Sequence, residues 1–260
     1  MRAHRFGAGR FKDARDPTCY LCTTVRMEAA LEALEQRAAA SRGTRLTPTH
    51  LVAHVLSQAL KAAPDTNVVR RLGRVQRRAE VAVSLIVVQP GSGGRTDLTL
   101  VTLRNGDAKT LETLAAEVER GVQEARDGRD ARMERGKRRA ARVPGPLLGV
   151  AAWLVGAIQY GLNLSLTPLG LPRDPFGGVA LSNVGSLGLD RGFAPLVPHT
   201  HVPLVVAMGA VRPAARVEQG AVVAARVMDL TYTFDRRAMT ELEVGALAED
   251  IVRRLERPLR

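Results

Sequence analysis

Hydrophobic and polar residues follow two different periods along the chain, one typical of strands and one typical of helices. Alternating or β-branched apolar runs predict strands over 18–25, 81–88, 98–103, 179–182, 202–211 and 229–234. Apolar residues three and four positions apart predict helices over 27–40, 48–64, 110–126 and 242–256. Thr47 is expected to cap the second of these helices, because its hydroxyl precedes a proline in the first turn.

These elements lack the regular strand–helix–strand order of a parallel sheet. We therefore expect a mixed β-sheet with packed helices, an α/β chain of the α+β kind. Residues 217–225 contain Glu-Gln-Gly and are expected to form a hairpin, and Gly91–Gly94 a turn between strands. Residues 1–17 are polar and basic and are expected to be an N-terminal arm, so that a single domain spans 18–260.

One segment, residues 129–178, is expected to be an apolar insertion in this domain. Its central part, 144–172, contains the uncharged stretch Leu147–Leu166 and follows the basic run Lys137–Arg142. The uncharged stretch has the length of a membrane span, and flanking cations fit the bias of membrane proteins. Its glycines and polar residues dilute the apolar character, however. Three interpretations stay open: packing inside the protein or at an interface, an interfacial helix on a membrane, and a true span.

The composition is strongly basic, with a formal net charge of +12 over 260 residues. This balance favours an anionic partner, which could be nucleic acid, an acidic membrane surface or a phosphorylated cofactor such as coenzyme A. The chain has no zinc-finger spacing, no aromatic-rich platform and no helix-turn-helix pattern, which argues against nucleic acid. The basic N-terminus has no apolar core, so we expect no signal peptide. We therefore expect a cytoplasmic protein, and any contact with a membrane would be peripheral.

Cysteines and histidines form no recognisable metal or redox motif. The two cysteines of Cys19–Cys22 are three positions apart in a predicted strand, which places them on opposite faces. His50 and His54 are one helical turn apart, whereas His199 and His201 would share a face if they lay on a strand. Since neither histidine pair has a visible third ligand, we expect no metal site.

Five segments occur in an order that carries a family resemblance. They are Ala63–Val69 (APDTNVV), Ala79–Val88 (AEVAVSLIVV), Leu100–Val118, Ala180–Pro198 and Val227–Arg237 (VMDLTYTFDRR). Together they resemble the catalytic domain of dihydrolipoamide acyltransferases, the core subunits of 2-oxo acid dehydrogenase complexes. The resemblance implies a chloramphenicol acetyltransferase-like fold, acyl transfer between coenzyme A and a thiol, and a homotrimer or larger homo-oligomer with its active site between subunits. No lipoyl domain is expected ahead of this region.

The resemblance also points to candidate site residues in Thr231–Glu241. Dihydrolipoamide acyltransferases carry Asp-His-Arg-x-x-Asp-Gly at this strand-to-helix junction, and Asp235 and Arg237 match that motif. Arg236 stands in place of the histidine and Thr240 in place of the second aspartate. Glu241 replaces the glycine, which removes backbone freedom at an expected turn and adds a charge.

Ser182 aligns with the Ser or Thr that holds the oxyanion in the family, and its alternative role is a strand-end serine bonded to local backbone. Arg236 cannot replace the histidine, because a guanidinium has only donors and accepts no proton at neutral pH. We therefore expect an acyltransferase-fold protein that is catalytically impaired, with its status as an enzyme open. The alternatives are a trimeric scaffold or regulatory partner of an active paralogue, an acyltransferase with altered machinery, and a peripheral membrane protein that uses residues 144–172.

Overall fold

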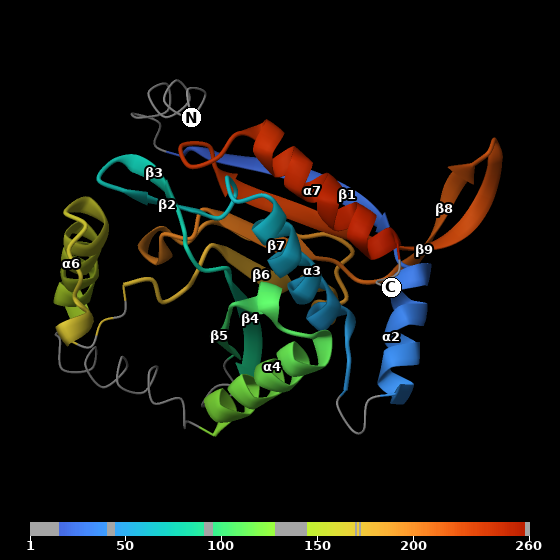
Figure 1. Ribbon diagram of the computed structural model, residues 1–260, viewed down its shortest axis with the longest axis horizontal. Coiled ribbons are helices and arrows are strands. Elements are labelled where there is room, and N and C mark those ends of the chain that lie inside the picture. Colours follow the sequence, from blue (N-terminus) through green and yellow to red (C-terminus); the bar gives the residue numbers. More distant parts are fainter. Residues whose placement is uncertain are drawn as a thin grey trace.

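The computed structural model describes residues 16–40, 45–90, 96–127, 145–169, 171 and 173–257. Its main element is a seven-stranded sheet in the order β1-β9-β7-β6-β4-β5, with β8 paired to β9 (Figure 1). The strands are β1 (Thr18–Arg26), β4 (Ala82–Pro90), β5 (Thr96–Arg104), β6 (Val179–Asn183), β7 (Leu204–Met208), β8 (Arg212–Glu218) and β9 (Ala221–Asp235). Strands β4, β6 and β7 are parallel and the other pairs antiparallel, which confirms the predicted mixed sheet.

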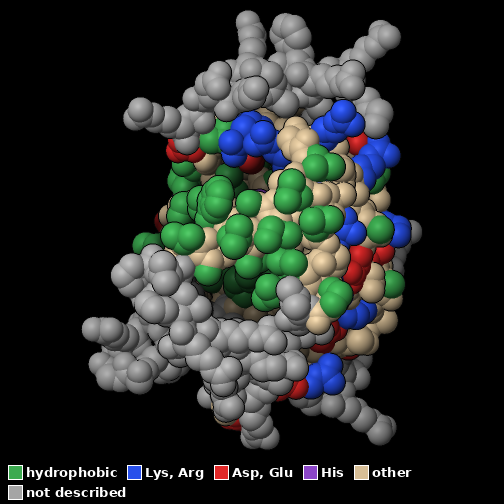
Figure 2. Space-filling view, turned by 90° about the vertical axis from the view of Figure 1, so that its left-hand side faces the viewer, with side chains coloured by type: hydrophobic (Ala, Val, Ile, Leu, Met, Phe, Trp, Pro, Cys, Tyr) green, Lys and Arg blue, Asp and Glu red, His purple; other side chains and the backbone are tan. Residues whose placement is uncertain are grey.

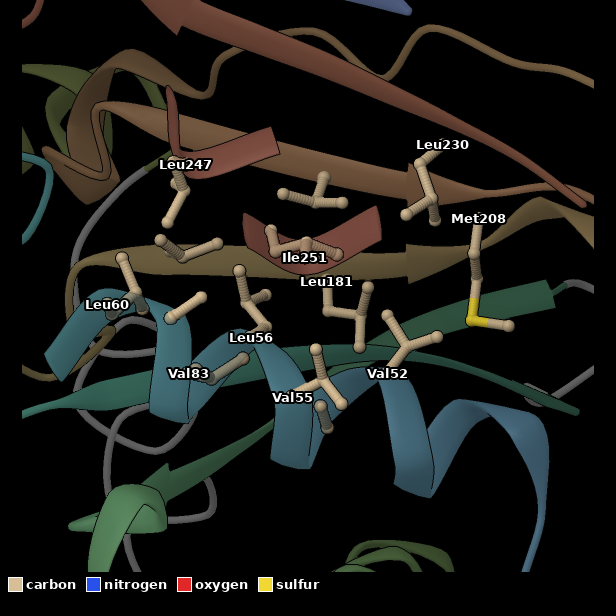
Figure 3. Close-up of a cluster of buried hydrophobic side chains, with 14 of the residues drawn as sticks. Val52, Val55, Leu56, Leu60, Val83, Leu181, Met208, Leu230, Leu247 and Ile251 are labelled. Atoms are coloured by element: carbon tan, nitrogen blue, oxygen red, sulfur yellow. The ribbon is translucent and has the colours of Figure 1, made fainter. Parts of the chain in front are cut away.

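Helices cover one face of this sheet. They are α2 (Glu28–Ala40), α3 (Pro48–Ala62), α4 (Leu111–Arg126) and α7 (Glu241–Glu256), and α3 and α7 pack side by side (Figure 1). Leu56 from α3 and Ile251 from α7 meet Leu181 of β6 in the core between the helices and the sheet (Figure 3). Thr47 caps α3 as predicted, since its hydroxyl accepts the His50 N–H at 3.4 Å.

The chain on either side of β6, residues 174–178 and 184–201, contacts the opposite face of the central strands. Ala180 of β6 and Val205 of β7 form a second, small apolar cluster there with Phe176 from this segment. On the same face, the Thr231 hydroxyl donates to the Gly192 carbonyl oxygen at 2.5 Å. Side chains of β6 alternate between the two faces, with Leu181 under the helices and its neighbours on the other side.

A two-stranded hairpin, β2 (Val68–Arg71) and β3 (Arg74–Arg77), was not among the predicted elements. Its turn places Leu72 at φ 52° and Gly73 at φ 68°. A two-residue hairpin of this kind needs positive φ at both positions, which Asn-Gly or Asp-Gly usually signals in a sequence. Leucine gives no such signal, so this hairpin could not be read from the pattern.

The hairpin predicted at 217–225 is confirmed, but its strands β8 and β9 are longer than expected. The turn lies at Gln219–Gly220, and β9 then continues without a break to Asp235. Strand β7 is shorter at both ends than the predicted 202–211, and it follows a 3-10 turn at Pro198–Thr200. The expected arm 1–17 and the turn Gly91–Gly94 lie outside the described residues, except for residues 16 and 17.

The predicted insertion contains helix α6 (Gly145–Gly156), the π-helical turn η3 (Ala157–Gly161) and the 3-10 turn η4 (Thr167–Leu169). Helix α6 lies at one edge of the molecule, near the β2–β3 hairpin (Figure 1). The structure buries Gln159 and Tyr160 of η3, yet Trp153 of α6 is 71% exposed. The interpretation that this segment packs inside the protein is therefore correct for η3 and wrong for the outer side of α6. Within the described residues no helix is long and apolar enough to cross a membrane.

Candidate functional site

The chain turns between β9 and α7, and the candidate residues of the last motif form this turn. The Asp235 N–H donates to the Pro203 carbonyl oxygen at 2.9 Å, and the Asp235 carbonyl oxygen accepts the Ala238 N–H at 2.8 Å. Arg237 holds the Asp235 carboxylate through Nε at 3.0 Å and Nη2 at 2.9 Å. Such a two-point contact fixes the carboxylate in place, so Asp235 is a structural anchor of the turn.

Arg236 forms an ion pair with the first residue of α7. Its Nη1 lies 2.5 Å from Oε2 of Glu241, and its backbone N–H donates to the Pro17 carbonyl oxygen at 3.0 Å. Glu241 is helical and has no positive φ, so this position does not need the backbone freedom of a glycine. A carboxylate in the first turn of a helix is favourable, and here it also neutralises Arg236.

Thr240 closes the turn as the N-cap of α7. Its hydroxyl accepts the Glu243 N–H at 3.3 Å, and the Glu243 carboxylate accepts the Thr240 N–H at 2.7 Å. This reciprocal pair is a capping box, which satisfies two of the free N–H groups at the helix start. In this chain, Thr240 therefore acts as the N-cap residue at which helix α7 starts.

Ser182 lies at the carboxyl end of β6, between Ile86 of β4 and Ala207 of β7. It is half-buried, and strand alternation from Leu181 turns it away from the helices. No hydrogen bond from the Ser182 hydroxyl is formed within the part of the chain that the structure describes. The alternative role, a serine bonded to local backbone, is therefore not what this hydroxyl does. The adjacent Asn183 makes such a bond to local backbone, since its side chain accepts the Ser186 N–H at 2.9 Å.

The register of the sheet separates Ser182 from Arg236. Ser182 is level with Ala207 on β7, which is level with Thr231 on β9. Arg236 follows Thr231 by five residues, and strands rise about 3.3 Å per residue, so the two side chains start about 16 Å apart. One copy of the chain cannot bring both residues to one reacting group.

Cationic and aromatic side chains gather at the end of the sheet where Arg236 lies. The His201 ring stacks on Tyr160 with ring centroids 3.7 Å apart and planes 19° apart. The Arg71 guanidinium lies 5.4 Å from the Tyr160 ring centroid, within cation–π range. Arg70 faces the Asp235–Arg237 pair, and burial, helped by the Arg237 charge, lowers the pKa of Arg70.

Sequence reasoning missed Arg70, Arg71 and Tyr160 as members of this end of the sheet. No sequence signal marked the two arginines, because the chain is rich in arginine throughout. His201 was considered as a strand residue, but it follows the 3-10 turn at φ 53°. The side chain of His199 lies outside the described residues, so the expected shared face with His201 is not tested.

The remaining candidate ligands lie apart from this turn. Cys19 and Cys22 are both free thiols on β1, the first packed against the core and the second exposed, as strand alternation predicted. His50 and His54 are buried on α3, and burial lowers the pKa of both imidazoles. Within the described ranges, no group of three or more His, Cys, Asp or Glu residues is placed to hold a metal ion.

Comparison with protein families gives a match to the catalytic domain of the 2-oxoacid dehydrogenase acyltransferases. The match covers residues 10–136 and 176–260, which include Ser182 and the whole turn after β9. It leaves residues 137–175, and thus all of α6, unmatched. No curated protein matches the chain in a sequence search.

Solved structures of similar fold extend over nearly the whole chain. A probable dihydrolipoamide acetyltransferase from Listeria monocytogenes 4b F2365 is 14% identical, with 98% of this chain and 90% of that chain covered at a TM-score of 0.68. The cubic core of a pyruvate dehydrogenase multienzyme complex is 17% identical, with 98% and 88% covered at a TM-score of 0.68. A chloramphenicol acetyltransferase is 14% identical, with 96% and 94% covered at a TM-score of 0.50. These likenesses confirm the predicted fold.

Proposed function

The chain belongs to the 2-oxoacid dehydrogenase acyltransferases, through their catalytic domain, and we propose on this premise that it is a catalytically lapsed member. Its proposed role is that of a homo-oligomeric scaffold or a regulatory partner of an active paralogue in the cytoplasm. The reaction suggested by the family resemblance needs a base that takes the proton from the attacking thiol, because the thiolate is the nucleophile.

The observation that carries this proposal is the ion pair between Arg236 and Glu241 at 2.5 Å. Arg236 stands where the resemblance places the base, and a guanidinium has no lone pair with which to accept a proton. The other two changed positions also have structural tasks, since Thr240 caps α7 and Glu241 balances the arginine. The turn is thus rebuilt to hold the fold together, which agrees with an intact scaffold that lacks a base.

A homotrimer or a larger assembly is part of the proposal. It is supported by the separation of Ser182 from Arg236, because a site that uses both ends of the sheet requires two copies of the chain. The solved relative from a pyruvate dehydrogenase complex is a cubic core, which shows that this fold can assemble. Analytical ultracentrifugation should show a trimer or a multiple of it; a monomer at micromolar concentration would contradict the assembly.

Coenzyme A is the proposed ligand of the cationic end of the sheet, which it would contact through its phosphates. Among the described residues, the buried Nε–H groups of Arg70 and Arg71 have no hydrogen-bond acceptor. A phosphate oxygen would supply such an acceptor, and charge-assisted contacts of this kind are strong. Calorimetry with coenzyme A should give weaker binding for Arg70→Ala than for the unchanged chain. Binding that is equal in both would remove Arg70 from this role and leave the catalytic proposal untouched.

A second candidate is an acyltransferase with altered machinery that acts on a small thiol, amine or alcohol. The observation in its favour is the Ser182 hydroxyl, which makes no hydrogen bond within the described residues and could therefore hold an oxyanion. His201 is at the end of the sheet where a base is needed, but its ring is stacked on Tyr160. This arrangement favours the lapsed site over a relocated base.

The test is an acetyl-transfer assay with the purified oligomer, acetyl-CoA and dihydrolipoamide. We expect turnover of about 0.1 per second or slower, because an ordinary enzyme turns over about 10 times per second and loss of a positioned base typically lowers that rate by about two to four orders of magnitude. Turnover in the range of ordinary enzymes, about 1 per second or faster, would contradict the proposal. Replacing dihydrolipoamide by a simple amine or alcohol in the same assay tests the second candidate.

A further inference from the structure

The insertion presents an exposed apolar surface. We define the α6 patch as Leu72, Val150, Trp153, Leu154, Leu162 and Leu164, each of which is at least half exposed. Val150, Trp153 and Leu154 are three and four positions apart on α6 and so share one side of the helix. Figure 2 shows hydrophobic side chains gathered on this face of the molecule, with Lys and Arg side chains beside them. Large exposed apolar surfaces of this kind mark contacts with a partner or a membrane.

The α6 patch is held against the domain by several specific contacts. The buried Tyr160 ring stacks on His201, and the Tyr160 carbonyl oxygen accepts the Leu72 N–H at 2.8 Å. At the last residue of α6, a Cβ built on Gly156 would lie 3.3 Å from Nε2 of His201, so the helix approaches the domain closely there. The segment is therefore anchored through its inner side while its outer side carries the apolar residues. An anchored helix presents its apolar side chains in a fixed direction.

The charges around the α6 patch are cationic. Residues 145–171 contain no Asp, Glu, Lys or Arg. Arg74 is exposed at the tip of the β2–β3 hairpin, next to Leu72, and has no ion pair among the described residues. Arg173 is also exposed, and donates to the Asn163 side chain. Two nearby carboxylates are already paired, Asp65 with Arg77 and Asp174 with Arg78.

We propose that the α6 patch docks on a lipid surface that contains anionic headgroups. The twelve residues of α6 are about 18 Å long, which is too short to cross the apolar core of a bilayer. A short apolar helix with an exposed tryptophan and flanking arginines suits the interface, where the ring lies at headgroup level and the cations meet phosphates. This inference goes beyond the proposed function and does not depend on acyl transfer.

Charge favours lipid over a second copy of the chain as the occupant. A patch-to-patch contact between two copies would bring Arg74 and Arg173 of each copy together, and like charges at such short range disfavour the contact. Anionic headgroups attract the same cations, each of which adds to membrane binding. The family match omits residues 137–175, so the α6 patch apart from Leu72 lies outside the matched segments.

Vesicle binding tests the proposal directly, with vesicles of phosphatidylcholine alone and of phosphatidylcholine with about one third phosphatidylglycerol. Trp153 is the single tryptophan of the chain, so its fluorescence reports on the α6 patch without a label. We expect co-flotation and a blue shift of Trp153 emission with the anionic vesicles, both weaker with the neutral ones. The double variant Leu154→Ser and Leu162→Ser should lower the bound fraction at least about tenfold while keeping Trp153 as reporter.

The matched control is Val217→Ser with Val222→Ser on the β8–β9 hairpin. Both valines are more than 70% exposed and lie outside the α6 patch, so this variant should bind like the unchanged chain. Absence of flotation and of the blue shift with anionic vesicles would overturn the proposal. A second result would also overturn it, namely a Trp153 emission that is already blue-shifted without lipid and shifts back to the red when the variant Leu154→Ser and Leu162→Ser dissociates the oligomer. That result would show that a second copy of the chain covers the patch.

Discussion

Ser182 and Arg236 lie at opposite ends of one sheet, about 16 Å apart along the strands. The two positions that the family resemblance joins into one site thus never meet within a single copy of the chain. Each has a distinct state in the structure: the Ser182 hydroxyl makes no hydrogen bond within the described residues, whereas Arg236 is paired with Glu241. The serine end is therefore preserved, and the end that should hold the base is rebuilt.

Thr240 is expected to contribute to stability through its capping box. Thr240→Ala removes the acceptor for the Glu243 N–H and should lower the free energy of unfolding by about 1 kcal/mol. Thr240→Ser keeps the hydroxyl and should change it by a few tenths of a kcal/mol at most. Urea unfolding at one fixed protein concentration measures both variants. Equal stability of Thr240→Ala and the unchanged chain would show that the cap is not needed.

Tyr160 is expected to fix the insertion to the domain. Tyr160→Ala removes the stack on His201 and the contact with Arg71, and should lower the free energy of unfolding by about 3 kcal/mol. Tyr160→Phe keeps the ring and is the matched control, with an expected loss below about 1 kcal/mol. Limited proteolysis gives a second measurement, because a detached insertion should be cut faster. If Tyr160→Ala is cut no faster than Tyr160→Phe, the ring does not hold the insertion.

The two buried histidines of α3 should make stability depend on pH. Burial lowers the pKa of His50 and His54 in the folded state, whereas an unfolded histidine titrates near about 6.5. The unfolded chain therefore binds more protons as the pH falls below that value, and stability decreases with it. Urea midpoints should drop between about pH 7.5 and pH 5.5.

The double variant His50→Gln and His54→Gln is the control for this pH dependence. It should show a smaller decrease over the same range, whatever its stability at pH 7.5. A decrease as large as that of the unchanged chain would assign the effect to other groups. The negative charges of Glu119 and Glu112 raise the pKa of His50 and His54 respectively, and so offset part of the effect of burial.

Much of the fold could be predicted because the decisive signals are local. Strand β1, helix α3 with its Thr47 cap and helix α7 follow from periodicity and capping chemistry within a few residues. The β2–β3 hairpin could not be predicted, since Leu72 in its turn adopts a conformation that leucine rarely takes.

The sequence was enough to name candidate residues for the site, but it did not predict the contacts that these residues make. The family resemblance named Ser182, Asp235, Arg236 and Thr240, but whether they meet depends on the register of three strands that are far apart in sequence. The stack of Tyr160 on His201 joins two segments with no local signal for each other. Glu241 shows the same limit: its replacement of a glycine indicated a loss of backbone freedom at a turn, and only the structure reveals a helical residue that neutralises Arg236.

The most direct measurement of the central claim compares acetyl transfer from acetyl-CoA to dihydrolipoamide by the unchanged chain and by Ser182→Ala, in matched oligomeric preparations. Without a base, both proteins should turn over at about 0.1 per second or slower. A rate of about 1 per second or faster for the unchanged chain, which falls in Ser182→Ala, would contradict the account and establish an active acyltransferase.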